Sequence, residues 1–203
     1  DALSALDAWN QEASYIDVKK REFKIKNLSL NVTQVCNLQC KYCAAGGDGT
    51  YGDPILKISI EQTLPQIKFF MDKLLPGDTF NLHYLGGEPL LYPIGMEAIG
   101  SFARELAHAR GLDLHLSVTT NGTLFNEKTI EVLKKLRCSV IVSMDGGKEI
   151  IDAQRPSKDG NSTADKILNG LPLLFEVKQD LGRINFHGVY GKFNMEILKA
   201  YEF

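Results

Sequence analysis

Three of the four cysteines of this chain lie close together. Cys36, Cys40 and Cys43 have the spacing C-x3-C-x2-C, and Cys138 stands apart from them. Thiolate is a soft ligand that suits both iron–sulfur clusters and zinc. A disulfide framework is not expected, because few cysteines, mostly crowded together, are untypical of one in a chain of 203 residues. The spacing therefore predicts a metal or cluster site in a protein from a reducing compartment.

Three thiolates can hold three corners of a cubane iron–sulfur cluster and leave one iron without a protein ligand. By analogy with catalytic zinc, an open coordination position marks a chemical site. The competing interpretation is a zinc site completed by Cys138 or His83. Cys138 begins a predicted buried strand and His83 lies inside another strand, where a core cysteine and a structural histidine are the commoner outcomes. The cysteine loop by itself leaves both kinds of site open.

Four further short motifs bring together glycine, polar and charged residues. Glycine lets the backbone approach a ligand closely, and a carboxylate can accept a charge-assisted hydrogen bond from an ammonium group. Each motif also has a plain alternative, which is a turn for the glycine-containing motifs and a surface arginine for the last one. The motifs are GGEP at 86–89, TTNG at 119–122, SMDG at 143–146 and RP at 155–156.

Apolar alternation predicts the strands that position these motifs. Apolar residues at intervals of three and four predict helices between them, which start after Ser59, Pro93, Asn126 and either Ser162 or Thr163, with another near Phe193. One helix between successive strands predicts a parallel sheet with right-handed crossovers. The motifs then follow the carboxyl ends of strands, where such sheets bind ligands. The predicted strands cover 28–35, 79–85, 112–119, 138–144 and 183–189.

The cysteine motif, with Tyr42 as the aromatic before its last cysteine, is followed by GGEPLL at 86–91. This combination resembles the radical S-adenosylmethionine (radical SAM) superfamily over about residues 28–190. The resemblance implies that Cys36, Cys40 and Cys43 hold a [4Fe–4S] cluster and that SAM chelates the open iron. It favours the cluster over zinc. One electron from a cluster can cleave a sulfonium C–S bond only if the two are held in contact.

The resemblance also implies a set of residues that bind SAM. Glu88 would accept from the SAM ammonium, and Arg155 would pair with the carboxylate through its bidentate fork. Tyr42 would pack near the adenine. The complete predicted set is Tyr42, Gly86, Gly87, Glu88, Thr120, Asn121, Ser143, Asp145 and Arg155.

The motifs after the third and fourth predicted strands refine the resemblance. Thr120 and Asn121 would lie near the SAM ribose and methionyl moiety. Ser143 would contact the ribose or carboxylate region, with Asp145 nearby. The S-x-D-G and R-P elements are similar to those of the peptide- and protein-modifying (SPASM-type) branch. The glycine-rich stretch 44–52 resembles an extension found in ribosomal-peptide maturases.

The implied fold is α/β, a partial (β/α)6 barrel of the TIM-like type. About five βα units are visible, so the core, residues 25–203, is expected to be truncated at its C-terminal end, after a flanking segment at 1–24. The branch usually continues into a cysteine-rich extension with auxiliary clusters. No cysteine follows Cys138 in this sequence.

The activity implied by the resemblance is reductive cleavage of SAM to a 5′-deoxyadenosyl radical, which abstracts hydrogen from a peptide to install a thioether or crosslink. The expected partners are a precursor peptide and a ferredoxin or flavodoxin. One alternative is an anaerobic sulfatase-type formylglycine maturase, which should carry a further acidic base and auxiliary cysteines. A second is a non-catalytic iron–sulfur or zinc module that docks a peptide.

Charge and composition exclude several other classes. With 23 basic and 25 acidic residues the formal charge is −2, which argues against nucleic-acid and anionic-membrane partners. The hydrophobic share of 44% and charged share of 24% are typical of a globular domain. No apolar run reaches the roughly 20 residues that span a bilayer, and no signal peptide is visible after Asp1. The predicted location is the cytoplasm.

Overall fold

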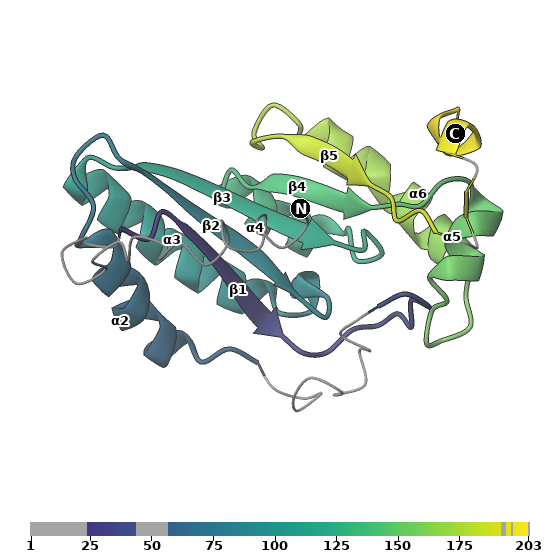
Figure 1. The fold of residues 1–203 in the computed structure, drawn as a ribbon, viewed down its shortest axis with the longest axis horizontal. Coiled ribbons are helices and arrows are strands. Elements are labelled where there is room, and N and C mark those ends of the chain that lie inside the picture. The colour runs from purple at the N-terminus through teal and green to yellow at the C-terminus, as the bar shows by residue number, and fades with distance from the viewer. Residues whose placement is uncertain (1–23, 44–56, 192–193, 196, 203) are drawn as a thin grey trace, which may run out of the picture.

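Five parallel strands form the sheet that positions the motifs (Figure 1). The computed structural model describes residues 24–43, 57–191, 194–195 and 197–202. The strands lie in the order β1-β2-β3-β4-β5, so neighbours in sequence are neighbours in the sheet. Their bounds are β1 (Asn27–Thr33), β2 (Thr79–Gly86), β3 (Asp113–Thr120), β4 (Ser139–Ser143) and β5 (Ile184–His187).

The helices of the crossovers cover one face of the sheet. Because strand order equals chain order, right-handed crossovers all fall on the same side, and Figure 1 shows α2, α3 and α4 there together. None of the described helices is both long and apolar enough to cross a membrane. The helices are α2 (Ile60–Met71), the 3-10 turn η2 (Pro89–Leu91), α3 (Pro93–Arg110), α4 (Glu127–Lys135), α5 (Lys148–Gln154), α6 (Thr163–Glu176) and α7 (Ile197–Tyr201).

The core lies between the sheet and these helices. In β2, Phe80, Leu82 and Tyr84 have no exposed surface, and the alternate residues Asn81 and His83 face the other side. This alternation follows from the two-residue period of a strand. The helices contribute further fully buried side chains, namely Ile67, Met71, Met96, Ile99, Leu133, Ile151 and Ile167.

The structure confirms the predicted parallel α/β sheet. Every predicted strand is present, and no end differs by more than two residues. Ser59 and Asn126 are N-caps whose side chains accept hydrogen bonds from backbone N–H groups, as the sequence predicted. Of the two predicted starts of α6, Ser162 is the N-cap and accepts such a bond. Pro65 lies inside α2 and Pro172 lies inside α6.

The expectation of one helix between successive strands is wrong between β4 and β5. Two helices, α5 and α6, fill that connection. Residues 148–154 show no repeating apolar stripe, and the short α5 is held mainly by the packing of Ile151, which has no exposed surface. The helix expected near Phe193 begins at Ile197. The flanking segment 1–23 and the glycine-rich stretch 44–52 lie outside the described residues.

The cap of α4 gives a stability prediction. Asn126 Oδ1 accepts from Thr129 N at 3.1 Å, and Thr129 Oγ1 accepts from Asn126 N at 3.1 Å. Asn126→Ala should lower the free energy of unfolding by about 1 kcal/mol, because it leaves N-terminal donors of the helix without an acceptor. Urea denaturation checks this. Lys128→Ala on the exposed side of α4 is the control, and equal losses for both variants would contradict the prediction.

Candidate functional site

The carboxyl ends of the first four strands bring the predicted motifs to one edge of the sheet. Gly86 ends β2, Thr120 ends β3, and Ser143 ends β4, while the cysteine loop (residues 36–43) follows β1. Neighbouring strands are parallel, with a register shift between Asn31 and Thr33 in the pairing of β1 with β2, and these ends lie next to one another. The predicted placement of the motifs at the carboxyl edge is confirmed.

The cysteine loop is paired along its backbone with the last residue of α5 and the segment that follows it. Gln39 N donates to Pro156 O and Lys41 N donates to Gln154 O, both at 2.9 Å. Lys158 N donates to Asn37 O at 3.1 Å. The loop that carries the cysteines is thus attached to the segment that carries the predicted Arg155-Pro156 motif, although more than a hundred residues separate the two in sequence.

The three thiols of the loop differ in exposure. Cys36 and Cys40 are half-buried, and Cys43 is exposed. Burial raises the pKa of the Cys36 thiol, and it raises the pKa of Cys40 to about 11. Cys36 Sγ accepts hydrogen bonds from Leu38 N at 3.5 Å and from Asn121 Nδ2 at 3.8 Å. Such N–H donors are the kind of group that tunes a cluster bound through sulfur.

The donor set fits a cluster better than a single zinc ion. In the described part of the chain, no three His, Cys, Asp or Glu side chains converge closely enough to hold one metal ion. Cys138 is fully buried in the core, and burial raises the pKa of its thiol to about 12. The two ring nitrogens of His83 are hydrogen-bonded to Ser117 and Thr119. Neither Cys138 nor His83 is therefore free to complete a zinc site at the loop. Three thiols on one short loop suit a cubane cluster, because the ligands of a cluster lie farther apart than those of a single metal ion.

The two glycines of the GGEP motif pack against the backbone that leads into the cysteine loop. Gly87 N donates to Thr33 O at 2.7 Å. A Cβ atom on Gly87 would lie 2.1 Å from Val35 O, and one on Gly86 would lie 2.4 Å from Thr33 O. Gly86 also has a φ of +146°, which favours glycine. The close approach that the sequence predicted is therefore made to the chain itself, and contact with SAM stays a prediction.

Glu88 joins the ends of β2 and β3. Its side chain has no exposed surface; Oε1 accepts from Thr120 Oγ1 at 2.7 Å and from Leu90 N at 3.0 Å, and Oε2 accepts from Asn121 N at 2.7 Å. Burial raises the pKa of Glu88 despite these hydrogen bonds. In this arrangement the carboxylate positions Thr120 and Asn121, and the predicted bond to the SAM ammonium stays a prediction.

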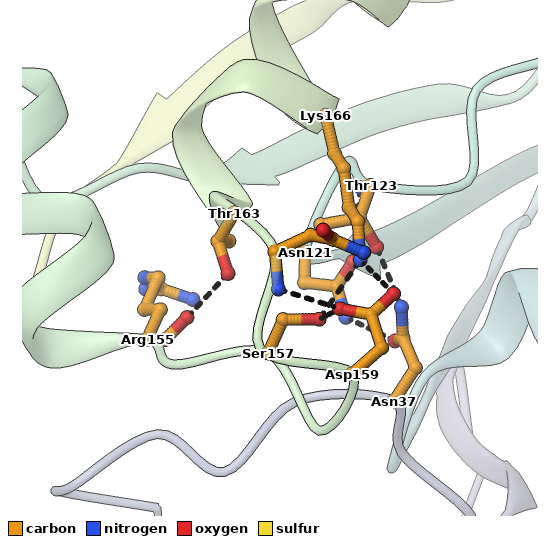
Figure 2. A network of polar contacts seen from close by, with 9 residues as sticks. Asn37, Asn121, Thr123, Arg155, Ser157, Asp159, Thr163 and Lys166 are labelled. Atoms are coloured by element: carbon orange, nitrogen blue, oxygen red, sulfur yellow. Dashed lines mark hydrogen bonds and ion pairs between the residues drawn. The ribbon is translucent and has the colours of Figure 1, made fainter.

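Asn121 continues this connection to the cysteine loop. Its Nδ2 donates to Asn37 Oδ1 at 2.9 Å, and Asn37 Nδ2 donates to Thr123 Oγ1 at 2.8 Å. Figure 2 shows these three side chains turned toward one another. Sequence reasoning missed Asn37 and Thr123, although both directly adjoin residues of the predicted motifs. Glu88, Asn121 and Asn37 thus link the ends of β2 and β3 to the first predicted cluster ligand.

Asp145, Arg155 and Tyr42 form a second group at this edge. Arg155 Nε and Nη2 donate to the two carboxylate oxygens of Asp145 at 2.8 and 2.9 Å, and Tyr42 Oη donates to Asp145 Oδ2 at 2.6 Å. Burial and the bond to Asp145 raise the pKa of Tyr42. Burial alone would lower the pKa of Arg155, but the bonds to Asp145 raise it. Ser143 lies half-buried at the end of β4, in register with His187.

These features can be compared with known proteins. The family model of the radical SAM superfamily matches residues 30–203. The chain belongs to the radical SAM superfamily. Membership confirms the two cofactors predicted from the sequence, a [4Fe–4S] cluster and SAM. It also accounts for the three thiols on a short loop at the carboxyl edge of the sheet.

Several relatives show which kinds of radical SAM protein the chain is similar to. A serine-type anaerobic sulfatase-maturating enzyme from Klebsiella aerogenes is 29% identical over 71% of this chain and 35% of its own length. The radical SAM cyclopropyl synthase TigE from Paramaledivibacter caminithermalis is 27% identical over 90% of this chain and 40% of its own. The chain therefore spans less than half the length of these two relatives.

A solved structure supports the fold assignment. Native anSMEcpe with bound AdoMet and Kp18Cys peptide superposes with a TM-score of 0.74 at 25% identity, over 87% of this chain and 47% of that one. The five-stranded parallel sheet with its outer helices thus matches part of the TIM-like barrel of radical SAM enzymes, as predicted. The sulfatase-maturating relatives and this structure are consistent with the peptide-modifying branch.

Proposed function

We propose that this radical SAM protein cleaves SAM reductively to a 5′-deoxyadenosyl radical that takes hydrogen from a peptide. The observation that carries the proposal is the chain of bonds from Glu88 through Asn121 to Cys36, which fixes the cysteine loop at the carboxyl edge of the sheet. A cluster held by the three cysteines would supply one electron to the sulfonium, and the protein would have to hold the two in contact. A cysteine loop that is already held in place lowers the entropic cost of bringing the cluster and the sulfonium into contact.

The protein residues have distinct roles in this proposal. Cys36, Cys40 and Cys43 hold the cluster. Gly86 and Gly87 keep the end of β2 against the segment that leads into the cysteine loop. We propose that their peptide groups contact SAM. Further contacts to SAM come from the rest of the predicted set, Tyr42, Glu88, Thr120, Asn121, Ser143, Asp145 and Arg155, either directly or by placing one another.

A peptide is the proposed substrate because two kinds of similarity support it. The S-x-D-G and R-P elements, SMDG at 143–146 and RP at 155–156, resemble those of peptide-modifying enzymes. The anSMEcpe structure contains a peptide, and another relative is named for sulfatase maturation. The proposed product is a crosslink or thioether, with a small ferredoxin or flavodoxin as the electron donor.

Transfer of hydrogen from the peptide tests the substrate class. The reconstituted protein is incubated anaerobically with SAM, a reductant and a deuterated candidate precursor peptide. We expect deuterium in the 5′-deoxyadenosine and a mass change in the peptide. Release of 5′-deoxyadenosine with an unchanged peptide and no deuterium would contradict a role for that peptide. Protein that is colourless and binds zinc would instead favour the non-catalytic docking module.

Formylglycine formation is the second candidate, favoured by the similarity to a sulfatase-maturating enzyme. Its test uses a sulfatase-derived peptide with the target serine or cysteine. An aldehyde product that reacts with a hydrazide probe would support formylglycine formation. A modified candidate precursor peptide, together with no aldehyde on the sulfatase peptide, would favour the crosslinking reaction.

A further inference from the structure

Asp145 lies where three segments that are distant in sequence meet. It lies two residues after the end of β4, and its side chain has no exposed surface. A buried carboxylate is costly unless it is paired and hydrogen-bonded. The hydrogen-bond partners of Asp145 therefore show which segments this residue holds together.

Protein donors fill the acceptor positions of this carboxylate. Oδ2 accepts from Arg155 Nε at 2.8 Å and from Tyr42 Oη at 2.6 Å. Oδ1 accepts from Arg155 Nη2 at 2.9 Å and from Val189 N at 2.8 Å. A carboxylate offers about four lone-pair positions. Asp145 therefore has little capacity left to bind a ligand directly, and its influence on the site passes through these partners.

One set of partners fixes the far end of the cysteine loop. The backbone pairing of the loop with 154–158 extends to Lys41 N. Beyond it, Tyr42 is held by its hydroxyl bond to Asp145 and by the Arg155 guanidinium, whose Cζ lies 5.3 Å from the centre of its ring. Tyr42 directly precedes Cys43 and lies two residues after Cys40, so these contacts restrain the part of the loop that carries two predicted cluster ligands.

The other partners belong to the segment after β5. Val189 N donates to the carboxylate, and Asn194 Nδ2 donates to the backbone oxygen of Asp145 at 2.8 Å. The same residue thus bonds to the cysteine loop, to the end of α5 and to the exit of the last described strand.

We propose that Asp145 is a positioning residue that couples the cysteine loop to the segment after β5. Its carboxylate holds Tyr42, Arg155 and Val189 in one arrangement, which sets the placement of Cys40 and Cys43. The consequence for the cluster rests on the proposed function. The coupling between segments is a property of the polypeptide and can be measured without catalysis.

Hydrogen–deuterium exchange of the reconstituted protein tests the coupling. Asp145→Asn keeps the size of the side chain but loses the charge and one acceptor oxygen. We expect about tenfold faster exchange at Lys41 N and at Val189 N, since a lost charge-assisted hydrogen bond has an effect of this order. Tyr42→Phe removes one donor alone and should speed exchange at Lys41 N while Val189 N keeps its wild-type rate.

Asp165→Asn is the matched control, because Asp165 forms an exposed ion pair with Lys148. It should leave both amides at wild-type rates. Asp145→Asn should also make the electron paramagnetic resonance signal of the reduced cluster heterogeneous. Wild-type exchange at Lys41 N in both test variants would overturn the proposal. If Asp145→Asn also speeds exchange throughout β2 and β3, the fold as a whole is loosened. In that case the exchange rate of Lys41 N in Tyr42→Phe decides whether the proposal holds. A wild-type protein that releases no 5′-deoxyadenosine would refute the proposed function and leave the exchange result valid.

Discussion

Serine at any one of positions 36, 40 or 43 should abolish cluster binding and SAM cleavage. Each cysteine is a proposed cluster ligand, and the serine hydroxyl is a poor replacement for a thiolate. The loss of 5′-deoxyadenosine release should exceed the roughly 10–100-fold that removal of an outer hydrogen-bond partner of a metal ligand costs. Iron and sulfide content and the visible absorption of the reconstituted variants give the direct readout.

Cys138→Ser is the matched control for these variants. Cys138 is the fourth cysteine of the chain and is fully buried in the core. A buried hydroxyl without a partner costs about 1–3 kcal/mol, so this variant should be less stable but should retain its iron and its activity. Loss of iron from Cys138→Ser, with iron retained in the loop variants, would mean that the cluster site is assigned to the wrong cysteines.

Gly87→Ala should displace the cysteine loop. The new Cβ would lie 2.1 Å from Val35 O and 2.8 Å from Gln34 O, and both are backbone atoms that cannot rotate away. Overpacking of this kind costs about 1–3 kcal/mol of stability. Because Gln34 and Val35 directly precede Cys36, we also expect a large loss of cluster occupancy. Thermal denaturation and iron content measure the two effects.

Gly191→Ala is the control for Gly87→Ala, since a Cβ at Gly191 would meet no atom within 4 Å. It should have wild-type iron content and a melting temperature close to wild type. A Gly87→Ala protein with a full cluster and unchanged stability would show that the packing of Gly87 does not hold the cysteine loop in place.

Much of the fold could be predicted because its signals are local. The alternation in β2 and the caps at Ser59 and Asn126 depend on residues close in sequence, and they were recognised. The placement of the motifs at one edge followed from the parallel topology alone. Helix α5 was not recognised, because it is short and its burial depends on tertiary packing around Ile151.

The internal bonding of the site could not be predicted in the same way. Sequence reasoning treated Glu88 and Asp145 as groups near a ligand, and the structure shows both carboxylates fully buried and bonded to protein donors. The partners of Asp145 come from residues 42, 155 and 189, and no local pattern connects these positions. Such contacts exist only once the sheet has brought the strand ends together.

Release of 5′-deoxyadenosine from SAM tests the central claim most directly. The purified protein is reconstituted with iron and sulfide under anaerobic conditions, reduced, and supplied with SAM. We predict a brown protein with iron and sulfide bound, and 5′-deoxyadenosine that forms only with reductant and is absent from Cys36→Ser. A wild-type protein that carries a full cluster but releases no 5′-deoxyadenosine above the Cys36→Ser background would contradict the account.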